Sequence, residues 1–104
     1  MSFRRYEILF PTRYNDGSQV EEEKFAQTRR ELIAEFGAIT WHPDRLQGAW
    51  THEDRVFEDA NIKVVVEVED TPGTERFFHA FKDTVKARFR QIDIWMVSYE
   101  VRIH

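Results

Sequence analysis

The stretch QIDIWMVSYEVRIH, residues 91–104, predicts the final strand of this chain. Successive side chains of a strand point to opposite faces, so every second residue shares a face. From Trp95 onward one of these two sets is apolar throughout, and the other is apolar from Ile92 to Met96 and polar from Ser98 onward. A strand of this length would exceed the usual length of about 5–6 residues. Because both faces begin apolar, we expect helices to cover one face and a second subunit to cover the other.

The segments before it predict a strand, a helix and a hairpin. Residues 4–10 alternate as a strand and end at Pro11. A helix should follow, because Ser18 and Glu21 have the spacing of a capping box and Gly37 suits a left-handed helix end. Two strands should lie between residues 38 and 69, joined by a turn at 52–55 and disturbed near Pro43.

A second helix should begin at Thr71, which can cap it, with Pro72 at the first helical position. It should end near Arg90, with basic residues in its last turn. Each helix then connects two parallel strands, and right-handed crossovers place both helices on one face of the sheet. The sequence therefore predicts one α+β domain over residues 1–104. Its fold class is ferredoxin-like βαββαβ, with a four-stranded antiparallel sheet in the order 4-1-3-2, two helices on one face and a long final strand.

Composition limits the function classes. The chain has 104 residues and no cysteine, which excludes disulfides, thiolate catalysis and cysteine-ligated metals. The net charge of −4 lacks the basic excess of a nucleic-acid binder, so no nucleic acid is expected as a partner. The N-terminal residues are too short and too interrupted for a signal peptide or membrane span. We expect a cytoplasmic protein with no membrane partner.

The uncovered sheet face predicts an interface between subunits. It should carry the apolar set of the last strand, joined by Leu9 or Tyr6 and by Val65 and two tryptophans. A homodimer is the prediction; the alternative is a twisted monomer whose loop and hairpin fold over the sheet. The interface residues predicted from the last strand are Trp95, Val97, Tyr99, Val101 and Ile103.

This order of elements resembles the dimeric α+β barrels, in which the sheets of two ferredoxin-like domains pack face to face. The resemblance implies a cavity lined by aromatic residues, as in the cofactor-independent oxygenases and heme-handling enzymes of that group. An RNA-recognition domain has the same order, but its third strand needs aromatic residues for stacking bases. Here that strand reads VVVEVE over residues 64–69, so RNA binding is not predicted.

Candidate ligand-binding residues come from the loop after the first strand and from isolated aromatic residues and histidines. The loop joins a strand to a helix N-terminus, where free N–H groups and Arg13 could meet an anion, although nearby carboxylates oppose a phosphate. His42 and His52 could meet along the hairpin beside acidic residues, but turn histidines are the preferred interpretation and no metal site is predicted. The full ligand-binding set is Arg13, Tyr14, Asn15, Trp41, Trp50 and His79.

These observations predict a small soluble binding or regulatory protein that acts as a homodimer. Its partner would be a protein or a small molecule, and no cofactor is predicted. The alternative is an enzyme of the dimeric α+β barrel type, cofactor-independent or heme-handling, acting on an apolar small molecule.

Overall fold

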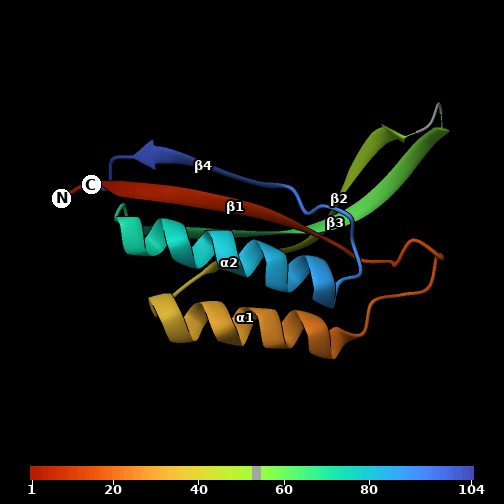
Figure 1. Cartoon of the computed structure of the whole chain (residues 1–104), viewed down its shortest axis with the longest axis horizontal. Helices are drawn as coiled ribbons and strands as arrows, with labels where there is room; N and C mark the ends of the chain where they lie inside the picture. Colours follow the sequence, from red (N-terminus) through yellow and green to blue (C-terminus); the bar gives the residue numbers. More distant parts are fainter. Residues whose placement is uncertain (53–54) are drawn as a thin grey trace.

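The computed structural model describes the backbone of residues 1–52 and 55–104 and the side chains of residues 1–42 and 60–104. The strands form one antiparallel sheet in the order β2-β3-β1-β4, and both helices lie on one side of it (Figure 1). The predicted ferredoxin-like βαββαβ fold and its strand order are therefore confirmed. In chain order the elements are β1 (Phe3–Pro11), α1 (Glu22–Phe36), β2 (Thr40–His52), β3 (Arg55–Glu69), α2 (Pro72–Arg88) and β4 (Met96–Val101).

Strand register decides which side chains face the helices. Tyr6 of β1 pairs with Val66 of β3 and with Ser98 of β4, so the even-numbered residues of these three strands share the helix side. Tyr6 stacks on Phe78 of α2, with ring centroids 3.7 Å apart and planes 11° apart. The odd-numbered residues lie on the opposite side, called the open face below, which no helix among the described residues covers.

The helix ends follow local sequence signals in three of four predicted places, including the end of α2 at Arg88, which has Lys86 and Arg88 in its last turn. Gly37 ends α1 in the left-handed conformation (φ 85°), and its N–H donates to the Ile33 carbonyl over 2.7 Å. Thr71 caps α2 as predicted, because its hydroxyl oxygen accepts from the Thr74 N–H. The predicted capping box of α1 is wrong: Glu21 is the N-cap residue, and its side chain caps no N–H.

The predicted length of the final strand is also wrong, since β4 has only six residues, Met96–Val101. The ladder with β1 reaches the Ile8–Met96 pair, and one further bond joins Leu9 N–H to the Trp95 carbonyl. The side chain of Ile94, one residue before Trp95, packs into the core and is 2% exposed. The Ile94 N–H donates to the side chain of Asp93 and not to a neighbouring strand. The apolar residues before Met96 therefore belong to a connection and not to a sheet strand, and only Ile94 among them is buried, since Ile92 is 78% exposed and Trp95 48%.

Strands β2 and β3 form a hairpin that extends past the helix layer (Figure 1). The predicted disturbance near Pro43 is present as a register shift between His42 and Leu46. Beyond it, pairing continues to His52 and Arg55, which agrees with the predicted turn, although residues 53 and 54 themselves lie outside the described residues. None of the helices in the part of the chain described is long and apolar enough to cross a membrane.

Candidate functional site

The open face carries exposed apolar side chains along β4. By register, Val97, Tyr99 and Val101 lie on this face; Trp95 precedes the strand and Ile103 follows it. Trp95 is 48% exposed, Tyr99 41% and Ile103 55%, whereas the two valines are half-buried. The structure thus places the predicted interface residues in one row, and their role as an interface stays a prediction.

A polar cluster occupies the middle of the same face. Glu7 is only 9% exposed, because Lys63 forms an ion pair with one carboxylate oxygen and the Tyr99 hydroxyl donates to the other. These hydrogen bonds, from Lys63 first and then from Tyr99, lower the pKa of Glu7. Arg5 extends the cluster: its Nε donates to Glu67 over 3.0 Å, and its guanidinium carbon lies 5.9 Å from the centre of the Tyr99 ring.

Sequence reasoning missed this polar cluster. Its only sequence signal is opposite charges at odd-numbered positions of two strands, and this signal has no meaning until the strand pairing is known. The register places Arg5 opposite both Glu67 and Tyr99. A nearly buried charge such as that of Glu7 is costly unless it is paired, and here it is paired with Lys63.

The loop between β1 and α1 uses its tyrosine for packing. Tyr14 is 7% exposed; its hydroxyl donates to Glu21 and accepts from the ammonium group of Lys24. The bond from Tyr14 lowers the pKa of Glu21. The charged group of Lys24 and the guanidinium of Arg90 each lie within 5 Å of the Tyr14 ring centre, at 4.8 and 4.7 Å. Arg13 is exposed and donates to the Gly17 carbonyl over 2.8 Å.

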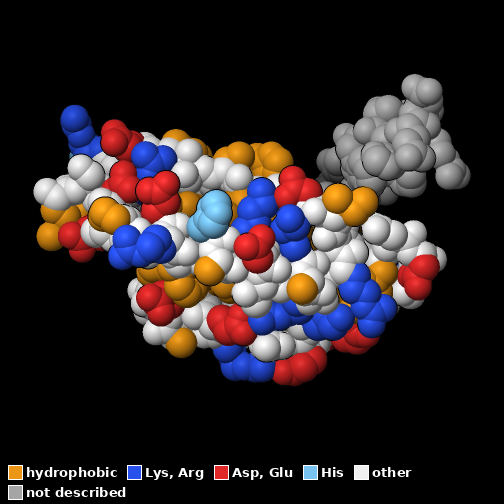
Figure 2. Space-filling view, viewed as in Figure 1, with side chains coloured by type: hydrophobic (Ala, Val, Ile, Leu, Met, Phe, Trp, Pro, Cys, Tyr) orange, Lys and Arg blue, Asp and Glu red, His pale blue; other side chains and the backbone are white. Residues whose placement is uncertain are grey.

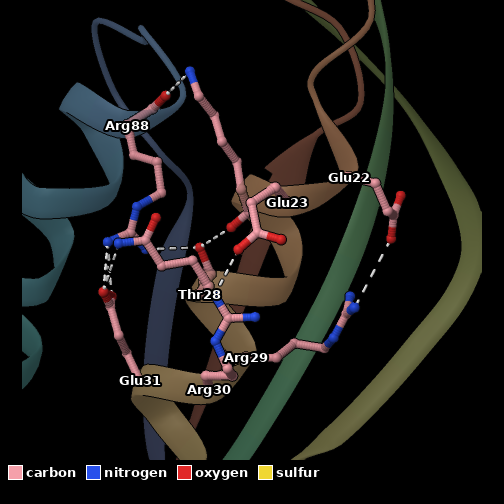
Figure 3. A network of polar contacts seen from close by, with 9 residues as sticks. Glu22, Glu23, Thr28, Arg29, Arg30, Glu31 and Arg88 are labelled. Carbon is pink, nitrogen blue, oxygen red and sulfur yellow. Dashed lines mark hydrogen bonds and ion pairs between the residues drawn. The ribbon is translucent and has the colours of Figure 1, made fainter.

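Helices α1 and α2 are joined by a network around Arg88, drawn in Figure 3. The Arg88 guanidinium donates to both carboxylate oxygens of Glu31, at 2.7 and 2.8 Å, and to the Thr28 hydroxyl at 2.8 Å. Lys24 donates in turn to the Arg88 carbonyl over 2.9 Å. This network fixes the two helices relative to each other and, through Lys24, to the Tyr14 loop.

The remaining predicted ligand-binding residues lie apart from the loop. Trp41 is on the helix side of the sheet and not on the open face; its ring lies edge-on to Phe25, 6.3 Å away, with the Arg29 guanidinium 4.2 Å from the ring centre. Trp50 lies outside the described side chains. His79 is exposed on α2, and Asn15 is exposed in the loop.

His79 lines a groove between α2 and β4, called the β4–α2 groove below, with a volume of about 340 Å³. The described members of the ligand-binding set therefore do not converge on one cavity: the loop residues, Trp41 and His79 occupy three places. The ligand-binding role of each stays a prediction. The other residues of the β4–α2 groove are Arg4, Tyr6, Asp70, Glu75, Phe78, Lys82, Met96, Val97 and Ser98.

Metal-binding side chains are not gathered in the described part of the chain, where no three His, Asp or Glu residues are placed to hold an ion. His42 is exposed on β2, and the side chain of His52, which the hairpin arrangement would need, lies outside the described residues. Figure 2 shows acidic and basic side chains interspersed over the visible face, a pattern typical of a solvated surface.

The fold and the open face together define a small ferredoxin-like α+β protein. No protein-family profile matches the chain, and no curated protein matches it either. Solved structures do match. CutA1 from Oryza sativa is similar over 100% of this chain and 84% of its own, with 12% identity and a TM-score of 0.68.

Two further structures have the same fold. The divalent cation tolerance protein CutA1 from Thermus thermophilus matches over 98% of this chain and 86% of its own, with 17% identity and a TM-score of 0.67. The complex of B. subtilis GlnK with ATP matches over 96% and 82%, with 16% identity and a TM-score of 0.56. At these identities the likeness concerns the fold alone.

Proposed function

We propose that this chain is a small binding or regulatory protein that acts as a homo-oligomer through its open face, with a homodimer as the simplest assembly. The observation that carries the proposal is the row of exposed apolar side chains beside β4, led by Trp95 and Tyr99. Half-buried Leu9 and Phe3 adjoin this row on β1. Contiguous apolar surface of this kind marks interaction sites more often than free surface.

The polar cluster supports a second copy as the partner. It presents both signs of charge on one face, with Arg5 and Lys63 beside Glu7 and Glu67. In a twofold assembly the same patch meets itself, so a face with both signs can complement a copy of itself. Paired charges surrounded by apolar side chains also suit an interface core, where an unpaired charge would be costly.

Sedimentation equilibrium at tens of micromolar protein tests the proposal. The expected mass is at least twice the 12.5 kDa of one chain. Trp95→Ala should weaken assembly at least about 30-fold, which corresponds to an interface anchor worth about 2 kcal/mol. Ile33→Ala is the matched control, because Ile33 is similarly exposed, at 46%, but lies on α1. A mass of one chain would refute the proposal, and equal effects of the two variants would remove Trp95 from the interface.

The neighbouring structures suggest ligands that we do not assign to this chain. GlnK was solved with ATP, and the Thermus CutA1 is named for divalent cation tolerance. Identities of 16–17% do not carry ligand-binding residues from one chain to another. The homodimeric α+β barrel subclass, the expected cytoplasmic location and the ligand all stay predictions.

The alternative function, an enzyme of the dimeric α+β barrel type, would need the β4–α2 groove or an inter-subunit cavity as its site. His79, with Arg4 and Lys82 in the same groove, is the observation that favours it. The heme-handling form of this alternative is tested by adding hemin to the purified protein and recording its absorption spectrum. A shifted Soret band that His79→Ala abolishes would support it, and an unchanged spectrum of free hemin would contradict it.

A further inference from the structure

The outer edge of β4 is a second unpartnered surface. β4 is the last strand of the sheet, and no strand among the described residues pairs with its outer side. The Leu9 N–H donates to the Trp95 carbonyl, so Trp95 is a residue whose backbone groups face β1. In an antiparallel pair every second residue of a strand bonds to the neighbouring strand, and the residues between point their N–H and C=O groups the other way. The bonds to β1 therefore come from the odd-numbered residues. The N–H and C=O groups of Met96, Ser98 and Glu100 point outward, and such a row of free groups is a template for another strand.

The β4–α2 groove lies beside this edge, on the helix side. Its deepest residues are Tyr6 and Phe78, which stack on each other and are 7% and 1% exposed. Met96 and Ser98 line it from β4, and His79 lines it from α2. Side chains of an added strand would alternate in direction, so every second one would enter the groove above this aromatic floor.

Each end of the groove carries an ion pair, and the Glu100 end has the further carboxylate of Glu100 itself. Arg4 pairs with Glu100 in the strand register and forms an ion pair with Asp70 at 3.1 Å, so Asp70 marks the Glu100 end. Lys82 forms an ion pair with Asp93 at 3.1 Å, just before β4, and so marks the Met96 end. Arg4 also donates to the Ser98 hydroxyl over 3.1 Å. Glu75 of α2 adds a second carboxylate to the groove.

We propose that the β4–α2 groove binds an extended peptide segment of a partner protein, which joins the sheet as a strand antiparallel to β4. The free groups of Met96, Ser98 and Glu100 bond to its backbone, as in other proteins that bind peptides by strand addition. Apolar side chains at alternate positions enter the groove above Tyr6 and Phe78. The N-terminal end of the segment is basic, beside Glu100 and Asp70, and its C-terminal end is acidic, beside Lys82.

This surface differs from the open face, and the two share only Val97, which lies on the open face and borders the groove. The edge groups point sideways from the sheet, and the groove lies on the helix side, whereas Tyr99 and the polar cluster lie on the opposite side. Peptide binding therefore does not depend on the assembly proposed above.

The probe is an acetylated, amidated heptapeptide. It has lysine first and glutamate last, valine at the third and fifth positions, and threonine at the second, fourth and sixth. Titration to 1 mM against the full ¹⁵N-labelled chain should shift the amide signals of Met96, Ser98 and Glu100. N-methylation of the third residue removes an N–H that faces β4 and should weaken binding at least tenfold. N-methylation of the fourth residue, whose N–H faces solvent, is the matched control and should change affinity less than threefold.

Variants of the protein test the same edge. Ser98→Pro removes an outward N–H without removing a bond to β1, since proline is tolerated at such edge positions. It should weaken peptide binding at least tenfold, whereas Ser98→Ala keeps the N–H and should stay within threefold. Equal binding of the two methylated peptides, or no shift at the β4 amides, would overturn the proposal. A fall in assembly mass caused by Ser98→Pro alone would assign this edge to a second copy and would overturn it too.

Discussion

Replacement of Arg88 by alanine should destabilise the fold by about 2 kcal/mol. The side chain is 10% exposed and makes three hydrogen bonds to α1, two to Glu31 and one to Thr28. Glu31 is 36% exposed, so water screens the ion pair and we assign it about 1 kcal/mol. The bond to Thr28 and the buried aliphatic stem contribute about 1 kcal/mol more. For a domain of this size the expected fall in unfolding midpoint is about 8–12 °C.

Arg30→Ala is the matched control. Its guanidinium pairs with Glu23 at 2.6 Å, but the two side chains are 63% and 74% exposed (Figure 3). A pair at such a surface position contributes little, so the expected change is within about 0.5 kcal/mol. Both variants are measured by urea unfolding and by circular dichroism melting, at one protein concentration because self-association would shift the midpoint.

A double-mutant cycle isolates the ion pair from the rest of the Arg88 side chain. Glu31→Ala combined with Arg88→Ala should give a coupling free energy of about 1 kcal/mol. If Arg88→Ala and Arg30→Ala cost the same within error, partial burial does not strengthen the Arg88 network and the reasoning fails. A coupling free energy near zero would refute the ion-pair contribution alone.

Two further predictions concern Arg90 and Glu7. Arg90 has a left-handed backbone (φ 54°), and its guanidinium stacks on Tyr14. In thermal unfolding the Arg90→Gly variant should be more stable than the Arg90→Ala variant by about 1 kcal/mol. Both variants lose the stacking on Tyr14, but only glycine removes the backbone strain. An alanine variant as stable as the glycine variant would contradict this. The pKa of Glu7 is lower in the folded chain than in the unfolded chain, so the stability that it provides is complete above about pH 4.3 and is lost as the pH falls through the lowered value. In urea unfolding, Glu7→Gln should therefore lose less stability than the unchanged chain as the pH falls below about 4.3, and parallel curves would argue against the role given to Lys63 and Tyr99.

The candidate sites were less predictable than the fold. The apolar row around Trp95 follows from alternation along one strand, and its placement beside β4 agrees with that pattern. Tyr14 has the expected position in the loop, but the sequence did not indicate that Lys24, Glu21 and Arg90 would contact it. These partners come from different elements, so no local spacing reveals them.

The sequence by itself determined the order of elements, the left-handed end of α1 at Gly37 and the cap of α2 at Thr71, because these depend on neighbouring residues along the chain. With right-handed crossovers, that order determined the strand order as well. Only the tertiary structure decided that β4 begins at Met96: β1 continues to Pro11, but the chain before Met96 leaves the sheet because Ile94 packs into the core. It also decided that Arg88 meets Glu31, a contact that strand register and helix packing create between residues far apart in the chain.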